Sequence, residues 1–231
     1  MFYGGEQTDQ TQRRYRRHYS EDGSMEISND IQSNTTNFVF YLGGDAYNAP
    51  AIWKEEHIIP TGMVNRNLYY LHRDYQGTIL QTTNAAGSIQ DNRLFDAWGN
   101  VLKITTANNR ILFTFLVTDR GYTGHEHLLS VGIIHMNGRL YDPFLHRFLS
   151  PDNYVQDPTN TQNFNRYGYV MNNPLTRIDP SGEIVFAFLI PVLGKFFATV
   201  VSSAIVGAAI GVAGYTASVA FSDGGFNNWN W

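Results

Sequence analysis

The stretch Arg73-Asp74-Tyr75-Gln76-Gly77-Thr78-Ile79 decides the fold, and Phe95-Asp96-Ala97-Trp98-Gly99-Asn100-Val101 repeats its pattern 22 residues later. Each unit follows the pattern Asp-x-x-Gly-x, where x is any residue, and an apolar residue that begins a strand comes next. Because an aspartate carboxylate accepts hydrogen bonds from a turn backbone and glycine adopts positive φ, each unit predicts a tight turn between strands. Asp22-Gly23-Ser24-Met25-Glu26-Ile27 is a looser version. Such a repeat predicts a strip of hairpins that winds into a larger sheet, since one hairpin cannot bury its faces alone.

Working outward from this repeat, residues 1–120 are typical of β structure. Runs rich in β-forming residues, such as 37–42 and 111–117, alternate with turn signals such as Asn84-Ala85-Ala86-Gly87. The densest basic cluster, residues 13–19, predicts the solvated face of a strand or a charged edge strand, with a phosphate-binding patch as the alternative. We therefore expect a mainly β chain whose first domain is residues 1–120.

Two zones of different character follow. Residues 121–183 are rich in Asn, Pro, Tyr and Asp, which predicts a compact irregular segment with short helices; one helical turn is expected within 166–174, stopped by Pro174. Residues 184–231 begin with an almost wholly apolar stretch, which predicts an apolar, helical C-terminal segment. Within it, 196–221 lacks charged residues and is long enough to span a bilayer. The alternatives are a helix enclosed by the β structure and a linker.

Composition narrows the function. The chain of 231 residues has a net charge of −4, which argues against nucleic-acid binding. The absence of cysteine excludes a disulfide framework, a thiolate metal site and a cysteine nucleophile. His125 and His127 would share one face of a strand, but their spacing does not match a helical two-histidine zinc site, so we expect no metal and no cofactor. Met1-Phe2-Tyr3-Gly4-Gly5 leads into polar residues without a secretory signal, so either the protein stays inside until a machine releases it or the chain is a fragment of a longer protein. We expect a fragment, because the first turn pattern is typical of the middle of a repeat array.

An ordered series of motifs between residues 69 and 182 resembles the RHS repeat-associated core of bacterial RHS/YD-repeat proteins. The residues that carry the resemblance are Phe95-Asp96-Ala97-Trp98-Gly99, Arg120-Gly121-Tyr122-Thr123-Gly124-His125-Glu126, Met136-Asn137-Gly138-Arg139-Leu140-Tyr141-Asp142-Pro143, Arg147-Phe148-Leu149-Ser150-Pro151-Asp152, and Asn172-Asn173-Pro174 through Asp179-Pro180-Ser181-Gly182. The resemblance implies that the repeats coil into part of a hollow, curved β shell. It also implies that residues 121–183 form a core that plugs the shell.

The resemblance further implies that the core cuts its own chain and frees the segment that follows, which in this family is often a toxin. The implied catalytic residues are Asp152, Asp179 and an assisting Arg139, and the implied cut lies between Glu183 and Ile184. The implied partners are the chain's own C-terminal segment, upstream repeats or a delivery system, and an immunity protein. The implied location is secreted or at the cell surface, with membrane association through 196–221.

The implied chemistry agrees with general principles. Two carboxylates brought close together share one proton, so one can activate water while the other protonates the leaving group. An arginine can hold one carboxylate ionised through a bidentate contact. The proposed bond follows Asp179 by only a few residues, so the reaction is nearly intramolecular.

Two departures from the family and several alternatives remain open. Glu183 stands where the family often has leucine, and the segment between Asp152 and Asp179 is a few residues longer than its commonest form. Both aspartates adjoin proline, so they also fit turn formers whose carboxylates accept backbone hydrogen bonds, and Arg139 also fits a structural strand arginine. The sequence therefore supports three hypotheses: a self-cleaving aspartic endopeptidase, a non-catalytic shell and plug, and a degenerate remnant whose shell is too short to close.

Overall fold

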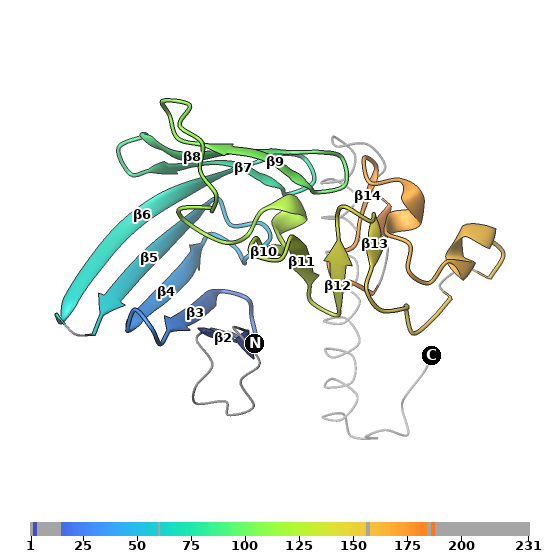
Figure 1. The fold of residues 1–231 in the computed structure, drawn as a ribbon, viewed down its shortest axis with the longest axis horizontal. Helices are drawn as coiled ribbons and strands as arrows, with labels where there is room; N and C mark the ends of the chain where they lie inside the picture. Colours follow the sequence, from blue (N-terminus) through green and yellow to red (C-terminus); the bar gives the residue numbers. More distant parts are fainter. Residues whose placement is uncertain (1, 4–14, 60, 156–157, 184–185, 188–231) are drawn as a thin grey trace, which may run out of the picture. The chain divides into compact units, whose positions relative to one another are not determined.

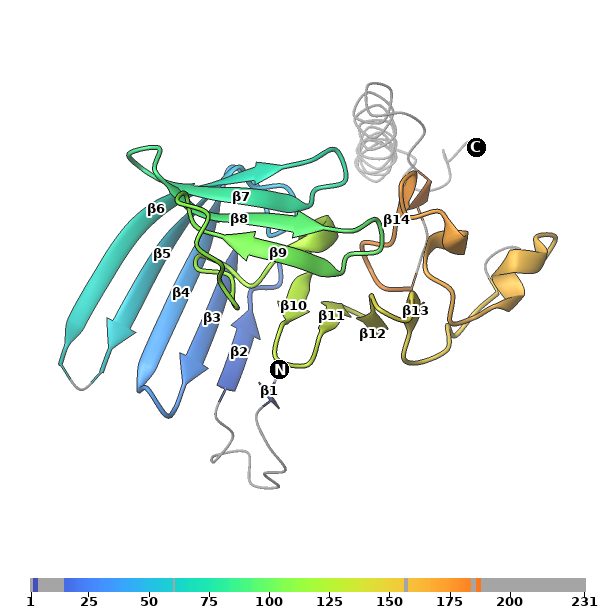
Figure 2. The same ribbon diagram turned by 45° about the horizontal axis from the view of Figure 1, so that its top comes forward.

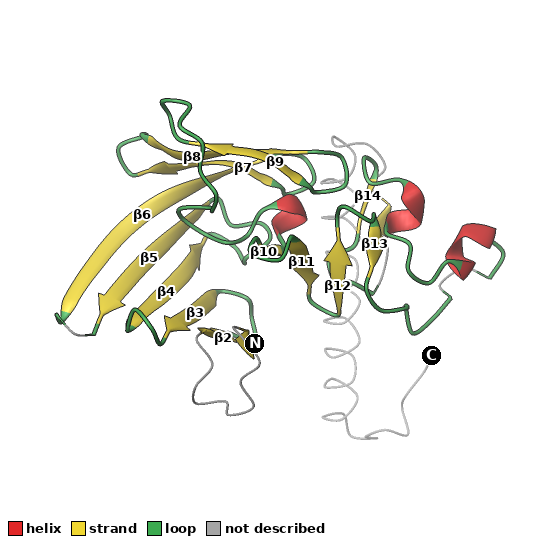
Figure 3. Ribbon diagram, in the orientation of Figure 1, coloured by secondary structure: helices red, strands yellow, loops and turns green. Residues whose placement is uncertain are grey.

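The computed structural model describes residues 2–3, 15–59, 61–155, 158–183 and 186–187 (Figure 1). The chain divides into two compact units, Met1–Phe186 and Ala187–Trp231. The first unit is mainly β with short 3₁₀ helices, as predicted (Figure 3). The apolar segment expected at 184–231 lies outside the described residues, apart from Phe186–Ala187. In the described part of the chain, no helix has the length and apolar character to cross a membrane.

The first unit is built on a nine-stranded antiparallel sheet in which every strand pairs with its neighbours in the sequence. Figure 2 shows β2–β6 side by side, with β7–β9 running in a different direction. The pairing shifts register between β6 and β7, between β7 and β8 and between β8 and β9. Such bulges increase local twist and bend a sheet, so they account for the curvature there. The strands are β1 (Phe2–Tyr3), β2 (Tyr15–Tyr19), β3 (Met25–Asp30), β4 (Thr35–Leu42), β5 (Ala51–Ile58), β6 (Met63–Arg73), β7 (Ile79–Asn84), β8 (Ile89–Phe95) and β9 (Val101–Thr105).

The repeated Asp-x-x-Gly unit forms the predicted turn. Asp74 Oδ1 accepts hydrogen bonds from the backbone nitrogens of Gln76 and Thr78, both at 2.9 Å. Asp96 Oδ1 accepts equivalent bonds from Trp98 and Asn100 at 2.8 and 2.9 Å. The fourth residue of each turn is in the left-handed region, with φ of 83° at Gly77 and 91° at Gly99.

Each 22-residue repeat also contains a second turn of the same design. Asn84 Oδ1 accepts from the backbone nitrogens of Ala86 and Ser88 at 3.0 and 2.9 Å. Thr106 Oγ1 accepts from Arg110 at 3.3 Å. Turns at 74–78, 84–88, 96–100 and 106–110 thus connect or follow the strands β6–β9, and a side-chain oxygen on the first residue stabilises each.

The segment 112–120 crosses a face of the large sheet instead of forming the strand predicted at 111–117, and that prediction is wrong. Buried Asp91 and Arg93 of β8 account for the difference. Asp91 Oδ2 accepts from the Leu116 backbone nitrogen at 2.8 Å, and Arg93 donates to the Thr118 carbonyl at 3.2 Å. These side chains satisfy backbone groups that a neighbouring strand would otherwise bond.

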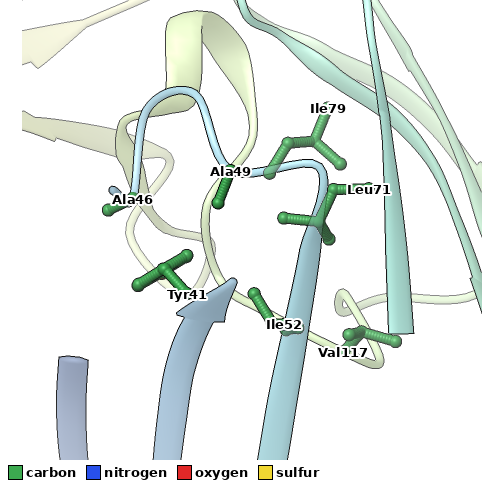
Figure 4. Close-up of a cluster of buried hydrophobic side chains, with 7 residues drawn as sticks. All are labelled: Tyr41, Ala46, Ala49, Ile52, Leu71, Ile79 and Val117. Carbon is green, nitrogen blue, oxygen red and sulfur yellow. The ribbon is translucent and has the colours of Figure 1, made fainter. Parts of the chain in front are cut away.

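An apolar cluster lies beneath this crossing segment (Figure 4). Val117 from the segment packs with buried residues of the strands and of the loop between β4 and β5. The cluster's members are Tyr41, Ala46, Ala49, Ile52, Leu71, Ile79 and Val117. Buried Arg120 adds an ion pair with Glu26 of β3, with 2.7 Å between Nε and Oε1.

The basic cluster at 13–19 is only partly the solvated face that we predicted. In the described part of it, Arg17 of β2 is largely buried and forms ion pairs with Asp119 and with Glu126, the latter at 3.0 Å. Arg17 therefore helps to attach the core segment to the sheet. Arg13 and Arg14 lie outside the described residues.

The core segment, residues 121–183, is built around a second sheet of four antiparallel strands, β10 (Glu126–Leu128), β11 (Ile133–Met136), β12 (Arg139–Asp142) and β13 (Arg147–Phe148). Three 3₁₀ turns flank it: η2 (Tyr122–Gly124), η3 (Thr161–Phe164) and η4 (Val170–Asn172). The last is the helical turn expected before Pro174. Strands β14 (Arg177–Ile178) and β15 (Phe186–Ala187) pair with each other. A second buried cluster fills this segment, made of Tyr122, Ile134, Met136, Tyr141, Phe148, Tyr169 and Val170.

Gly99 and Gly87 offer a matched test of how the repeat turns support the core. A Cβ at Gly99 would lie 2.6 Å from the Tyr122 ring, whereas a Cβ at Gly87 would meet nothing within 4 Å. Gly87→Ala should therefore cost only the left-handed backbone strain, about 1–2 kcal/mol of unfolding free energy. Gly99→Ala should cost a further 1–3 kcal/mol, roughly, from overpacking. Denaturant unfolding checks this, and equal losses would contradict the docking of the Gly99 turn on the core.

Candidate active site

Arg139 begins β12, directly after the tight turn Asn137-Gly138 that connects it to β11. Its side chain points into the core segment and is almost fully buried. The guanidinium lies 3.7 Å over the Phe148 ring of the neighbouring strand β13. Stacking on an aromatic face holds a guanidinium flat while its edge remains available for hydrogen bonds.

Asp152 follows β13 and is fixed through its backbone. Its nitrogen donates to the Arg166 carbonyl at 2.7 Å, and Arg166 Nε donates to the Asp152 carbonyl at 2.6 Å. The carboxylate Oδ1 accepts from the Tyr154 backbone nitrogen at 2.9 Å. Asp152 is therefore held at both backbone polar groups, and its Oδ2 faces Arg139.

Asp179 follows β14 and is completely buried. Its Oδ1 accepts from the Glu183 backbone nitrogen at 3.2 Å and from Ser181 Oγ at 3.3 Å. Gly182 is in the left-handed region with φ of 71°. Residues 179–183 thus reproduce the Asp-x-x-Gly turn of the repeats at the place where the resemblance puts a catalytic aspartate.

Arg139 brings the two aspartates together, although 40 residues separate it from Asp179. One nitrogen, Nη2, lies 3.2 Å from Asp152 Oδ2 and 3.4 Å from Asp179 Oδ2. Nη1 donates to the Arg166 carbonyl at 3.3 Å, and Nε donates to the Gly182 carbonyl. The guanidinium therefore contacts both carboxylates and one carbonyl of the turn that follows Asp179.

The remaining predicted site residues lie at the end of this turn. Glu183 is exposed, and a Cβ at Gly138 would lie 2.7 Å from its Cγ, so its side chain packs over the turn before β12. A Cβ at Gly182 would overlap the Met136 carbonyl, so only glycine fits there. Ile184 lies outside the described residues.

Contacts from the large sheet anchor the segment around Asp179. The Pro180 carbonyl accepts from Asn137 Nδ2 at 2.8 Å and lies 3.2 Å from His125 Nε2. Asn137 also bonds the Tyr47 hydroxyl at 2.6 Å. The repeat turn at 74–78 donates from Tyr75 and Gln76 to the carbonyls of Leu175 and Pro174, at 2.6 and 2.5 Å. The site is therefore built on the shell as well as on the core.

Sequence reasoning did not assign roles to Arg166, Phe148 or Asn137, although all three lie within the motifs or the segment it singled out. Their functions depend on backbone pairing and ring stacking between segments distant in the sequence. The only hint of these roles in the sequence was position: Phe148 lies next to Arg147 in a quoted motif, and Asn137 lies in the turn just before Arg139.

The histidines of β10 and its neighbourhood are structural. Burial lowers the pKa of His125 and of His127 to about 3 each, so both are neutral near pH 7. His127 Nε2 accepts from the Tyr122 backbone nitrogen at 3.0 Å. Among the described residues, no group of three or more His, Asp, Glu or Cys side chains could hold a metal ion.

A cavity of about 20 Å³ lies beside Asp152 and Arg139. Arg166, Gly168 and residues of η3 and η4 complete its wall. This volume suffices for one water molecule, which needs roughly 10–15 Å³ and several polar partners. A water there would lie beside Asp152.

The Teneurin YD-shell family model matches residues 55–175, which is more than half of the chain. The chain belongs to this family and is an RHS/YD-repeat shell protein. This agrees with the repeat turns and with the resemblance found in the sequence.

Curated relatives align with parts of this chain. The tRNA3(Ser)-specific nuclease WapA of Bacillus spizizenii is 26% identical over an alignment of 182 residues that covers 73% of this chain and 7% of that protein. The tRNA nuclease WapA of Bacillus subtilis is 28% identical over 120 residues, 51% of this chain and 5% of that protein. Salivary gland surface protein 1 of Aedes aegypti is 35% identical over 92 residues, 40% of this chain and 2% of that protein. The chain thus spans less than a tenth of the length of these relatives.

Solved structures of toxin complexes also align. The crystal structure of TcdB2-TccC3-Cdc42 has a TM-score of 0.49 and 20% identity, with 76% of this chain and 9% of that chain covered. The Photorhabdus luminescens Tc holotoxin pore has a TM-score of 0.44 and 20% identity, with 74% of this chain and 9% of that chain covered.

Replacing Arg139 tests the ion-pair network. Arg139→Met leaves two buried carboxylates without their cation, so we expect a loss of about 3–5 kcal/mol in unfolding free energy. Adding Asp152→Asn to Arg139→Met should restore part of this loss, because it removes one of the unpaired charges. Denaturant unfolding measures both effects. Arg147→Met, at an exposed position in β13, is the control and should change stability by no more than about 0.5 kcal/mol. Equal effects at 139 and 147 would contradict the network.

Acid pH should destabilise the core through the buried histidines. Their pKa is about 3 in the folded protein and near 6.5 when unfolded, so the unfolded chain binds more protons between these values. The contribution of these neutral histidines to the unfolding free energy is complete above pH 6.5. As the pH falls below that value, the unfolding free energy decreases by about 1.4 kcal/mol per pH unit for each histidine. Unfolding free energies at pH 7.5, 6.5 and 5.5 measure the slope. His127→Gln should lower it by about half below pH 6.5, and an unchanged slope in this variant would rule out His127 as its source.

Proposed function

We propose that residues 121–183 are an aspartyl autoprotease that cuts its own chain and frees the segment following the cut, within 184–231. The observation that carries the proposal is the meeting of Asp152 and Asp179 at one nitrogen of buried Arg139. Two carboxylates at one buried cation share the favourable charge interaction, and a proton on one of them relieves their repulsion. A pair of aspartates that shares one proton is the group that activates water in aspartic proteases.

The surroundings of the two aspartates support different roles for them. Asp152 borders the water-sized cavity, so it is the base that takes a proton from the attacking water. The other aspartate, Asp179, is completely buried and would be the acid that delivers a proton to the leaving nitrogen. Arg139 donates to the Gly182 carbonyl, one residue before the carbonyl of the expected cut, and would supply positive charge for the oxyanion that forms there.

The geometry also favours intramolecular cleavage. Hydrogen bonds from Arg139 and Asn137 to carbonyls of the turn at 179–183 hold it in place. Gly182 has no side chain, so the turn can lie directly against the Met136 carbonyl. A substrate held in this way needs no binding step, and orientation alone can contribute several kcal/mol, up to about 7–11, towards the barrier. From the resemblance, the cut is expected between Glu183 and Ile184.

A non-catalytic shell and plug is the second candidate, and a specific observation favours it. The Asp179 carboxylate makes the turn contact to the backbone nitrogen four residues on that Asp74 and Asp96 make in the repeats. If Asp179 served only to form the turn, no second carboxylate would be needed beside it. Asp152, however, contacts the same arginine, Arg139. This difference is the reason why we prefer the protease.

The wider role follows from the family and the relatives. We propose that the protein is secreted, displayed at the cell surface or delivered as part of a larger polymorphic-toxin-like protein. Its partners would be its own C-terminal segment, further repeats or a delivery system, and an immunity protein. The nuclease activity in the names of the WapA relatives is not assigned to this chain.

Aspartate variants test the proposal. Asp152→Asn and Asp179→Asn should each abolish cleavage while the chain remains folded, because an amide can neither take the proton from water nor share one. Intact-mass spectrometry of the purified 231-residue chain, with near-ultraviolet circular dichroism to confirm folding, measures both properties. Asp142→Asn is the matched control. Its Oδ1 caps the backbone nitrogens of Phe144 and Leu145 at 2.9 and 3.0 Å, and its loss of charge should leave cleavage unchanged. A folded wild-type chain that stays whole would leave the non-catalytic plug as the better account.

A further inference from the structure

A larger cavity lies between the large sheet and the crossing segment 112–120. Its volume is about 420 Å³, and residues of β2–β5 and of 115–119 line it. None of its lining residues also lines the small cavity beside Asp152. Small-molecule sites in proteins are typically cavities of roughly 300–1,000 Å³ with apolar walls and a few polar groups. The size of this cavity is therefore that of a ligand site.

The side chain of Lys54 forms part of the cavity wall. Lys54 lies on β5 directly opposite Val39 of β4, so it is on the face of the sheet that the crossing segment covers. Its Nζ donates to the Val117 carbonyl at 3.0 Å, which uses one of the N–H groups of the amine. Within the described ranges of the chain, no carboxylate is close enough to Lys54 for an ion pair. Most of the bonding capacity of this amine is therefore available to a ligand.

The surroundings of Lys54 favour the neutral form of its amine. Burial lowers the pKa of Lys54, because the charged ammonium group loses water that the protein does not replace. The charges of Asp119 and Glu56 oppose this effect without cancelling it. The neutral amine is the nucleophilic form, and buried lysines of this kind form Schiff bases with carbonyl compounds.

We propose that Lys54 is a binding site for small neutral aldehydes, which it holds covalently as an imine. This inference concerns a site separate from the proposed self-cleavage and does not rest on it. The Nζ lone pair attacks the carbonyl carbon, the carbonyl oxygen takes up a proton and the nitrogen loses one, which gives a carbinolamine. The hydroxyl then leaves as water with the second nitrogen proton, and the carbon–nitrogen double bond forms. One amine and one aldehyde thus give one imine and one water, with no oxidant or reductant.

Two neighbouring side chains suit this reaction. Glu56 follows Lys54 by two residues on β5, so both lie on the same face of the sheet. The Glu56 carboxylate can carry the protons that move between nitrogen and oxygen. Asn37 pairs with Glu56 across β4 and β5, and its buried Oδ1 has no hydrogen-bond partner among the residues that the structure describes. Such an acceptor is unfavourable until a donor reaches it, and the carbinolamine hydroxyl is a donor of this kind.

The charges of the lining favour a neutral ligand. The charged residues of the lining are the acids Glu26, Asp30, Glu56 and Asp119 and the bases Arg17 and Lys54. Arg17 already forms ion pairs with two carboxylates, so a ligand anion would have to compete for it. A 2-oxo acid or another anionic carbonyl compound would therefore enter a cavity of net negative charge. Val39, Phe115 and Val117 supply apolar surface for the remainder of a neutral aldehyde.

Reductive trapping on the full 231-residue chain tests the inference. The lysines of the chain are Lys54, Lys103 and Lys195, so peptide mapping by mass spectrometry can assign each labelled side chain. Benzaldehyde is the neutral probe, 4-carboxybenzaldehyde is its anionic match, and cyanoborohydride reduces each imine to a stable amine. The internal control is Lys103, an exposed lysine of β9. With benzaldehyde at pH 7.5, Lys54 should be labelled on the order of tenfold faster than Lys103. The anionic probe should lower this ratio.

Two further measurements show whether the cavity is the cause. In concentrated urea the two lysines should react at equal rates, because the unfolded chain has no cavity. Ser28→Phe places a ring in the lining, so it should slow the labelling of Lys54 and leave that of Lys103 unchanged, with near-ultraviolet circular dichroism to confirm folding. Equal rates in the folded wild-type chain, or a preference for Lys54 that persists in urea, would overturn the inference. A higher ratio with the anionic probe would overturn the neutral ligand.

Discussion

The buried guanidinium of Arg139 is the interaction on which the site depends. Burying its positive charge away from water costs free energy, so the folded protein can hold the charge there only when hydrogen-bond and ion-pair partners surround it. Its partners come from four places: Asp152 after β13, the Arg166 carbonyl, Asp179 after β14 and the Gly182 carbonyl. Stacking on Phe148 sets the plane in which these contacts form. The arginine is therefore a structural cross-link and also the group that brings two carboxylates together.

The same five-residue turn serves both the shell and the candidate site. In the repeats, a side-chain oxygen on the first residue holds the backbone nitrogen four residues on, and the fourth residue takes positive φ. At 179–183 the same contact and the positive φ recur, and under the proposed function burial and a second aspartate give this turn a chemical use. The shell also supports the site directly, because Tyr47, Tyr75 and Gln76 bond residues of the core segment. Such support holds catalytic groups within the small tolerances that catalysis requires.

Much of the fold could be predicted from local signals. The Asp-x-x-Gly spacing predicted the turns at 74 and 96, but their partners at 84 and 106 were not predicted as repeats because Asn and Thr replace Asp there. The strand predicted at 111–117 fails because Asp91 and Arg93 bond its backbone from a distance. Motif resemblance identified Arg139, Asp152 and Asp179, and the structure places them together. It could not identify the contacts of Arg166 or the peptide bond that faces Arg139, which depend on tertiary geometry.

The most direct test of the central claim is the mass of the chain after incubation in water enriched in oxygen-18. Hydrolysis by activated water places one heavy oxygen in the new carboxylate at the end of the shell and core fragment. The account predicts two fragments, the larger one carrying that label, and neither fragment in Asp152→Asn. A folded chain with a single, unbroken mass would contradict it and would leave Arg139 and its two aspartates as a structural cross-link.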